Sequence, residues 1–241
     1  MKKVFALITM LGISITAFAV NEPLVPEEFI PASDTFVIKK EKPDTVIIGD
    51  TMTVRNNQCI LEGRVKATRI NDVLTCNKAV LNNKPQWILA TIRPNLFRKE
   101  SIVETKVVRE MNISAKNIYL CKDDGTLSAS DTVVVSIDET TWDLATHTRV
   151  IITADELIGK EDSERLIFSG NVKIIEPEGD APSNGSGNRL DYLRKRSLAV
   201  LSGNAFISTW ELNPETNQKE KRTLKGKRVI YNTLTKEGIS E

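Results

Sequence analysis

The sequence is poor in the side chains on which most enzyme sites depend. It has a single histidine, His147, which lies in a polar, turn-like segment where we expect it on the surface. A Ser–His–Asp site would have to use this residue, and no nucleophile-elbow sequence is present. The chain also lacks a Cys-x-x-Cys pair and a glycine-rich phosphate loop. These absences argue against nucleophilic catalysis, thiol redox chemistry and zinc binding, and we predict no cofactor and no metal.

An excess of charge of one sign is also missing, because 33 basic residues stand against 32 acidic residues. This balance argues against polyanion binding as the main role of the protein. Paired carboxylates could cleave glycosidic bonds, and Asp131, Asp155 and Glu156 are among many candidates. Asp155, however, corresponds to Asn188 and Lys227 at matching positions of a repeat described below. Its place is set by the repeat, so we predict that the protein is not an enzyme.

Long apolar runs are absent except at the N-terminus. Two lysines after Met1 precede an uncharged, mainly apolar run from Val4 to Phe18, which ends in the triplet Ala17-Phe18-Ala19. The run is too short to span a bilayer, and the layout is that of a bacterial secretory signal peptide. We expect residues 1–19 to be removed by cleavage after Ala19, with an uncleaved anchor as the alternative. The proline-containing residues 20–44 are expected to form a tether.

Cysteines are few and odd in number: Cys59, Cys76 and Cys121. At least one is unpaired unless chains cross-link. Cys59 is in phase with the apolar Leu61 and Val65, which indicates that it packs as a small apolar residue. A Cys59–Cys76 bridge stays open in an oxidising compartment.

What the sequence does contain is a glycine motif that occurs three times. It covers Leu61–Ala67 (LEGRVKA), Phe168–Ile174 (FSGNVKI) and Leu201–Ile207 (LSGNAFI). Each has an apolar residue two before the glycine and apolar residues two and four after it. Period two predicts a β-strand with one apolar face, and a repeated strand unit favours a stack of strands over a catalytic globule.

A second repeated pattern places a small residue before a polar one, any residue and then an apolar one. It occurs at Cys76–Ala79, Ala115–Ile118, Ala154–Leu157, Gly187–Leu190 and Gly226–Val229. Asp155 precedes Gly170 by 15 residues, and Asn188 precedes Gly203 by the same interval. Small residues are tolerated where a strand bends, so the pattern predicts bends at matching places on successive strands, as in a sheet that curls around a groove.

The whole chain after residue 44 is predicted to be all-β and antiparallel. Aromatic residues make up only 5% of the chain, which depends on Val, Ile, Leu and Thr. Turn-forming sequences such as Asn56-Asn57 and Asp123-Asp124-Gly125 separate short strands, and residues 177–188 have the composition of a flexible loop. Residues 84–111 are expected to be irregular, although Trp87–Leu89 and Val103–Val108 have the composition of strands.

The apolar parity of the glycine motifs defines a candidate binding surface. Its members are Leu61, Val65, Leu166, Phe168, Val172, Ile174, Leu201, Ala205 and Ile207. The opposite parity is mostly polar, so one face of the stack is apolar and the other is wet. One interpretation is the core of a plain β-sandwich. The other is an open, jaw-like pair of sheets whose inner face holds acyl chains, and each CH₂ buried there contributes about 0.8 kcal/mol.

Two basic clusters lie in the C-terminal part of the sequence. One contains Arg189, Arg194, Lys195 and Arg196, and the other contains Lys219, Lys221, Arg222, Lys225, Lys227 and Arg228. They are expected either as charged hairpin tips and edges that prevent wrong strand pairing or as sites that attract phosphorylated sugar head groups.

The repeated units at residues 154–172 and 187–205 resemble the repeat of the OstA-like (organic solvent tolerance) family. That repeat is found in LptA, the periplasmic component of lipopolysaccharide transport. The resemblance extends over residues 45–241 and is best at 150–235. It implies a twisted, open jaw-like β-jellyroll (β-taco), with a first OstA-like half at 45–149 and a second at 150–241.

The resemblance also implies a function and partners. The protein would be a periplasmic, non-enzymatic carrier that binds the lipid A acyl chains of lipopolysaccharide and helps to bridge the inner and outer membranes. Edge strands would join it to transport proteins of both membranes, or head-to-tail to copies of itself. Nucleic acid is not expected as a partner. The alternatives are a membrane-anchored partner of the same pathway, if the N-terminal segment is not cleaved, and a structural, adhesin-like β-stack without a ligand.

Overall fold

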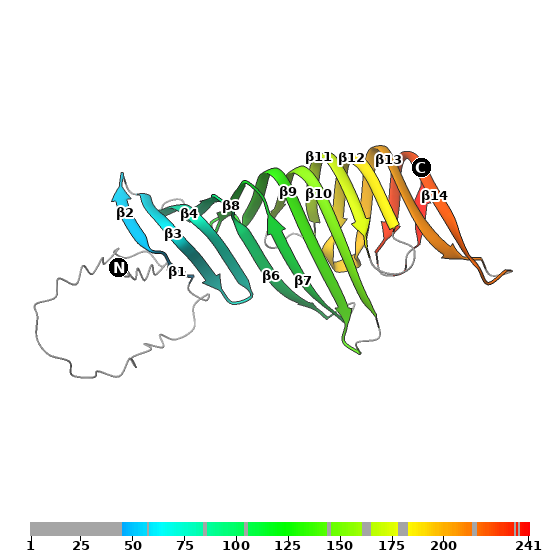
Figure 1. Cartoon of the computed structure of the whole chain (residues 1–241), viewed down its shortest axis with the longest axis horizontal. Helices are drawn as coiled ribbons and strands as arrows, with labels where there is room; N and C mark the ends of the chain where they lie inside the picture. Colours follow the sequence, from blue (N-terminus) through cyan, green and yellow to red (C-terminus); the bar gives the residue numbers. More distant parts are fainter. Residues whose placement is uncertain are drawn as a thin grey trace, which may run out of the picture.

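Segments in which apolar and polar residues alternate form long strands, and the computed structural model is all-β (Figure 1). It describes residues 45–56, 58–83, 86–103, 106–143, 146–160, 165–177, 183–213, 216–233, 235 and 237–241. In these residues one antiparallel sheet contains 15 strands, and the only helical element is a single 3-10 turn. The predicted fold class is therefore confirmed, whereas the expected signal peptide (1–19) and tether (20–44) lie outside the described residues.

The strands follow one another along the long axis of the molecule (Figure 1). They are β1 (Val46–Ile48), β2 (Thr51–Arg55), β3 (Gln58–Arg69), β4 (Asp72–Asn83), β5 (Gln86–Thr91), β6 (Asn95–Ile102), β7 (Val107–Ser114), β8 (Asn117–Cys121), β9 (Thr126–Thr141), β10 (His147–Lys160), β11 (Arg165–Glu176), β12 (Ser183–Leu193), β13 (Leu198–Leu212), β14 (Lys219–Asn232) and β15 (Gly238–Ser240), with the 3-10 turn η1 (Arg194–Arg196) between β12 and β13. The sheet runs without interruption through residue 150, which lies within β10. The division into halves at 149/150 stays a prediction.

Residues 84–111, expected to be irregular, contain β5, β6 and the start of β7. β5 and β6 both pair with β4, so they are two parts of one strand that is interrupted around Pro94. The strand predicted at Trp87–Leu89 is present in β5, but Val103 lies in a turn. Alternation was hard to recognise here because Arg98 and Arg109 occupy inward positions.

Residues Ser183–Asn188 belong to β12, although the composition of 177–188 indicated a loop. Small residues are needed here because β13 lies very close. A Cβ on Gly185 would lie 2.9 Å from the carbonyl oxygen of Phe206. In this segment the glycines therefore allow β12 and β13 to lie close together; they do not indicate a flexible chain.

A line of bends crosses the strands, and we call it the crease. Backbone φ is positive at Gly63 in β3, Ile92 and Arg93 between β5 and β6, Asp131 and Thr132 in β9, Gly170 and Asn171 in β11, and Gly203 and Asn204 in β13. The pairing registers of β3, β11 and β13 shift at these residues. The crease also passes through the small–polar pairs of the second sequence pattern, which lie on the strands that come before these bends in the chain. The predicted bends are thus present at matching places.

The 15-residue interval between Asp155 and Gly170 is explained by contacts that residues on neighbouring strands make at the crease. The side chain of Asp155 occupies the space that a Cβ on Gly170 would need, and Asn171 Nδ2 donates a hydrogen bond of 2.8 Å to the same carboxylate. Asn188 relates to Gly203 in the same way, because a Cβ there would lie 2.8 Å from Asn188 Nδ2. The glycines have φ of +73° and +72°, which side-chain-bearing residues rarely adopt. The repeat therefore encodes the bend.

The crease divides the sheet into two halves that face each other. Half-sheet 1 contains β1, β6 and β7, and half-sheet 2 contains β2, β5, β8 and β15, while β3, β4 and β9–β14 run through both. Inward side chains of both halves form one apolar core cluster. We call the long opening opposite the crease, where strand ends and hairpins meet, the mouth.

Candidate lipid-binding interior

All nine residues of the predicted lipid surface lie inside the fold, and none is more than 5% exposed. Each glycine motif straddles the crease, so the residues before the glycine and those after it lie on opposite half-sheets. Half-sheet 2 contributes Leu61, Leu166, Phe168 and Leu201; half-sheet 1 contributes Val65, Val172, Ile174, Ala205 and Ile207. The structure thus brings the predicted residues into one interior. Their role in lipid binding stays a prediction.

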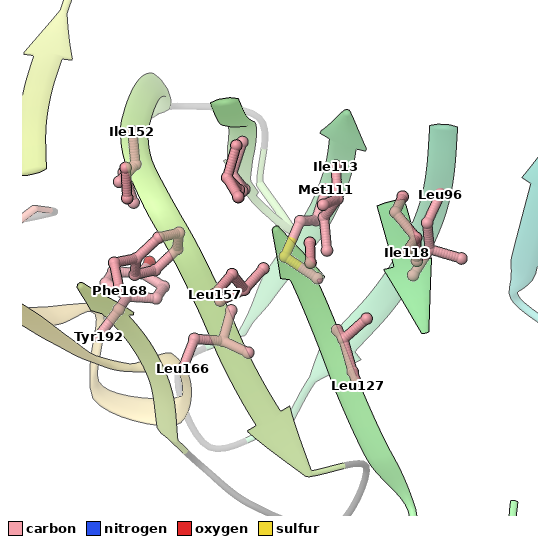
Figure 2. Packing of buried hydrophobic residues seen from close by; sticks show 14 of the residues in the cluster. Leu96, Met111, Ile113, Ile118, Leu127, Ile152, Leu157, Leu166, Phe168 and Tyr192 are labelled. Carbon is pink, nitrogen blue, oxygen red and sulfur yellow. The ribbon is translucent and has the colours of Figure 1, made fainter. Parts of the chain in front are cut away.

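The interior is apolar over the length of the stack and densely packed. Figure 2 shows Met111, Ile113, Leu157, Leu166 and Phe168 gathered among the surrounding strands. Phe168, Leu157 and Ile113 have no exposed surface. By contrast Ile175, the neighbour of Ile174 on β11, is 41% exposed on the outer face. An acyl chain can enter this interior only where the half-sheets separate.

A buried ionic cluster joins the two half-sheets at the mouth, and we call it the latch. Its centre is the carboxylate of Glu139 in half-sheet 1, which accepts hydrogen bonds from Arg109 Nε at 2.7 Å and from the Tyr192 hydroxyl at 2.8 Å. The hydroxyl of Ser197, between β12 and β13, donates to the same oxygen at 3.3 Å. Arg109 and Glu139 are each 1% exposed. Tyr192 belongs to half-sheet 2 and Ser197 directly precedes β13 there, so the hydrogen bonds of these two residues to Glu139 cross the mouth and close it.

The η1 turn extends the latch. Arg109 Nη2 donates to the carbonyl oxygen of Arg194, and Arg194 itself forms an ion pair with Glu100 of β6. The guanidinium of Arg109 also lies 5.5 Å from the centre of the Tyr192 ring. Burial lowers the pKa of Arg194, while the nearby Glu100 carboxylate opposes that shift. Buried charges of this kind are retained only when they are paired, so the cluster acts as a unit.

A second polar link crosses the mouth nearer the C-terminus. The Tyr231 hydroxyl in half-sheet 2 donates to Glu176 in half-sheet 1 at 3.3 Å, and both residues are buried. Burial, aided by the negative charge of Glu176, raises the pKa of Tyr231 to about 12. Burial also raises the pKa of Tyr192 in the latch. Both tyrosines are therefore neutral donors at physiological pH.

Sequence reasoning missed the latch. A signal was present, because Glu139 is in phase with Val133, Val135 and Ile137, and Arg109 is in phase with Met111. A charged residue at an apolar position of a strand indicates a buried pair. The sequence alone could not name the partner, since Tyr192 is 53 residues from Glu139.

The predicted basic clusters separate into different environments. Arg194 is buried in the latch, whereas Lys195 and Arg196 are exposed beside it. The cluster on β14 lies along an edge: β15 covers only Val229–Tyr231, and residues 219–226 pair with β13 alone among the described strands. At the other end of the stack β1 and β2 pair with β3 alone among those strands, and Val46, Ile48 and Val54 are exposed there. Unpaired strand edges can accept another strand.

Two further groups of residues that the sequence singled out are the histidine and the cysteines. His147 is exposed, with its Nε2 3.9 Å from Asp138. All three cysteines are free and buried, and Cys59 and Cys76 lie on opposite sides of the crease in β3 and β4, which excludes the bridge left open above. Among the described residues we find no group of three or more metal-binding side chains, and no helix long and apolar enough to span a membrane.

Comparison with known proteins gives little at the level of sequence. No family model matches the chain, and no curated protein matches it either. Among solved structures, the chain is similar to LptH of Pseudomonas aeruginosa, described as the LptA-homologous periplasmic component of the lipopolysaccharide transport device. The identity is 16% and the TM-score is 0.41, over 58% of this chain and 85% of LptH.

Proposed function

We propose that the protein is a non-enzymatic periplasmic carrier that binds the acyl chains of lipopolysaccharide between its two half-sheets. The observation that carries this proposal is the continuous apolar interior, which extends along the stack and ends at a polar mouth. An amphiphile has the same division, with apolar chains to bury and a polar head to leave in water. The OstA-like repeat at 154–172 and 187–205 supports the identification of the lipid.

Binding requires the half-sheets to part, so the energetics must offset the loss of the latch and of core packing. Ten buried methylene groups contribute about 8 kcal/mol at about 0.8 kcal/mol each. A lipid with several chains contributes a multiple of this, less the costs of ordering and association. The ion pair that crosses the mouth is Arg194–Glu100, and breaking a buried ion pair costs about 3–5 kcal/mol. The Arg109–Glu139 pair lies within half-sheet 1 and stays intact when the half-sheets part. The core side chains remain out of water because they exchange contacts with one another for contacts with the acyl chains, so the burial of the chains can offset the loss of the latch.

The edge strands supply a route to assembly. The edge of β1 and β2 that pairs with no other described strand and the basic edge of β14 lie at opposite ends of the stack (Figure 1). Strand addition at both would align the apolar interiors of successive proteins. This arrangement suits a bridge from inner-membrane to outer-membrane transport proteins, or a head-to-tail array of this chain.

A second candidate function is a structural β-stack without a ligand. The specific observation in its favour is the dense packing of the interior, where all nine predicted lipid contacts are at most 5% exposed. Such a module would need no opening and would use only its edges.

Purification from a bacterial periplasm followed by native mass spectrometry and lipid extraction separates these functions. The carrier is expected to retain a lipid A-type glycolipid, or to take up purified lipid A when it is supplied. A protein that stays free of lipid in both experiments, while its circular dichroism shows an intact sheet, would refute the carrier and leave the structural stack. Cleavage after Ala19, which periplasmic release requires, is read from the mass of the same sample.

A further inference from the structure

A row of hairpin ends forms one side of the mouth. On the side of half-sheet 1 the hairpins β3–β4, β6–β7, β9–β10 and β13–β14 reach the opening, and we call the row of their ends the lip. Backbone hydrogen bonds join the first three, from the Lys99 N–H to the carbonyl oxygen of Asn71 at 3.0 Å and from the Trp142 N–H to that of Lys106 at 2.8 Å. These hairpin ends therefore form a continuous rim, along the lower side of Figure 1.

Each hairpin of the lip exposes an apolar side chain at or near its end. Ile70 and Val103 are each 69% exposed in turns, Trp142 is 49% exposed in the β9–β10 turn, and Trp210 is 38% exposed near the end of β13. The other side of the mouth differs, because the described turn residues of half-sheet 2 include no exposed large apolar side chain. Single exposed apolar residues are ordinary, but a row of them along one rim indicates a contact surface.

The backbone of Ile70 supports this interpretation. Its φ is +34°, a region that β-branched residues rarely adopt and that glycine or asparagine would occupy with less strain. Its exposure would favour a polar residue as well. Strained residues persist where the structure has another use for them, so Ile70 favours a binding role for the lip over a role in turn formation.

The hairpin β13–β14 adds lysines to the lip. The pairing register places Trp210 opposite Lys221, and Lys219 and Lys225 have the same parity as Lys221 on β14. Thr209, next to Trp210, is buried, so Trp210 and the three lysines lie on the outer face. The lysines are exposed, and none of them forms an ion pair with a described residue. An apolar ring and positive charge thus lie side by side.

These side chains fit the surface of an anionic bilayer. Tryptophan is enriched at membrane–water interfaces, apolar side chains enter the boundary between head groups and acyl chains, and lysines are attracted to anionic head groups. A protein partner would be favoured by one contiguous apolar groove. The apolar side chains of the lip instead project from separate hairpin ends, where each can enter a fluid surface independently.

We propose that the lip docks on an anionic lipid bilayer, with Ile70, Val103, Trp142 and Trp210 entering the interface and the lysines of β14 contacting the head groups. This proposal does not depend on the carrier function, because the lip would hold a ligand-free stack on a membrane equally well. In a carrier, docking would turn the mouth toward the bilayer with which lipid is exchanged.

Vesicle flotation tests the docking. Protein purified from the periplasm is mixed with vesicles of phosphatidylethanolamine and phosphatidylglycerol, or of phosphatidylcholine alone. We expect the wild type to prefer the anionic vesicles. I70N/W142S should partition onto them at least five-fold more weakly. I92N/I158S is the matched control, because it replaces an isoleucine at φ +58° and a 48%-exposed apolar residue away from the lip, and it should float like the wild type.

A second pair of variants tests the charge. K221E/K225E should lose most of the preference for anionic vesicles. K116E/K173E makes the same change of charge at two exposed lysines near the crease and should keep the preference. Raised salt should weaken the binding of the wild type, because it screens the attraction of exposed charges. Circular dichroism of each variant checks that the sheet is intact.

Quenching by brominated acyl chains gives an independent measurement that leaves the lip unchanged. W87F retains Trp142 and Trp210 as its tryptophans, and their fluorescence should be quenched in anionic vesicles. W142F/W210F retains Trp87 of half-sheet 2, which should not be quenched. The proposal is overturned if the wild type does not float with anionic vesicles, if I70N/W142S floats like the wild type, or if only Trp87 is quenched. None of these results changes the uptake of lipid A, by which the carrier function is tested separately.

Discussion

Glu139 offers the sharpest perturbation of the latch. The substitution E139Q keeps the shape of the side chain and one acceptor oxygen, but it removes the negative charge that the buried Arg109 requires. Losing one partner of a buried pair costs about 3–5 kcal/mol. We expect the lower end, about 3 kcal/mol, because Glu100 remains 3.6 Å from Arg109 Nη1. For a chain of this size that lowers the melting temperature by about 6–12 °C.

The assay is thermal unfolding followed by circular dichroism. Two further variants show whether a change in melting temperature comes from the buried pair. E110Q removes the neighbouring but exposed Lys99–Glu110 pair and should change stability by no more than about 1 kcal/mol. R109M in the E139Q background removes the stranded cation and should recover most of the loss. If E139Q melts within 2 °C (roughly 1 kcal/mol) of the wild type, Arg109 and Glu139 do not stabilise the fold as a buried ion pair.

Further predictions address the crease, the second polar link and the cysteines. G170A places a methyl group at φ +73° against Asp155 and should cost about 1–3 kcal/mol in urea unfolding; an unchanged midpoint would contradict the crease contacts. The pKa of Tyr231 is raised to about 12 from an unfolded value of about 10, so the neutral hydroxyl stabilises the fold below pH 10 and this contribution is lost between pH 10 and 12. Melting temperatures of Y231F should therefore fall less steeply over that range than those of the wild type. Burial raises the pKa of Cys76 to about 11. When the protein is treated with a thiol-alkylating reagent, mass spectrometry should find no alkylation of the folded protein at pH 8 and three alkyl groups added in denaturant without reductant. A single alkyl group added in denaturant would indicate a disulfide.

The crease was predictable because a bend in a strand leaves a local signature. Gly170 and Asp155 must be small and short for their strands to approach, and the interval between them recurs at Gly203 and Asn188. Side-chain parity likewise identified the interior, because a strand exposes alternate residues to opposite faces. These features depend only on contacts between neighbouring strands, and those strands are also consecutive in the sequence.

The mouth was not predictable for the opposite reason. Its links join residues far apart in sequence, such as Glu139 with Tyr192 and Glu176 with Tyr231, and no local pattern pairs them. The sequence also could not distinguish an open jaw from a closed one. Whether the half-sheets meet depends on how the side chains of both half-sheets fill the space between them.

The most direct test of the central claim uses two adjacent residues on β11. Ile174 faces the interior and is 5% exposed, whereas Ile175 faces outward and is 41% exposed. A photoreactive diazirine amino acid is placed at either position, lipid A is supplied, and irradiated protein is analysed by mass. The account predicts lipid adducts at position 174 and few or none at 175. Adducts at 175 alone, or at neither position while lipid A is bound, would contradict the claim that acyl chains lie between the half-sheets.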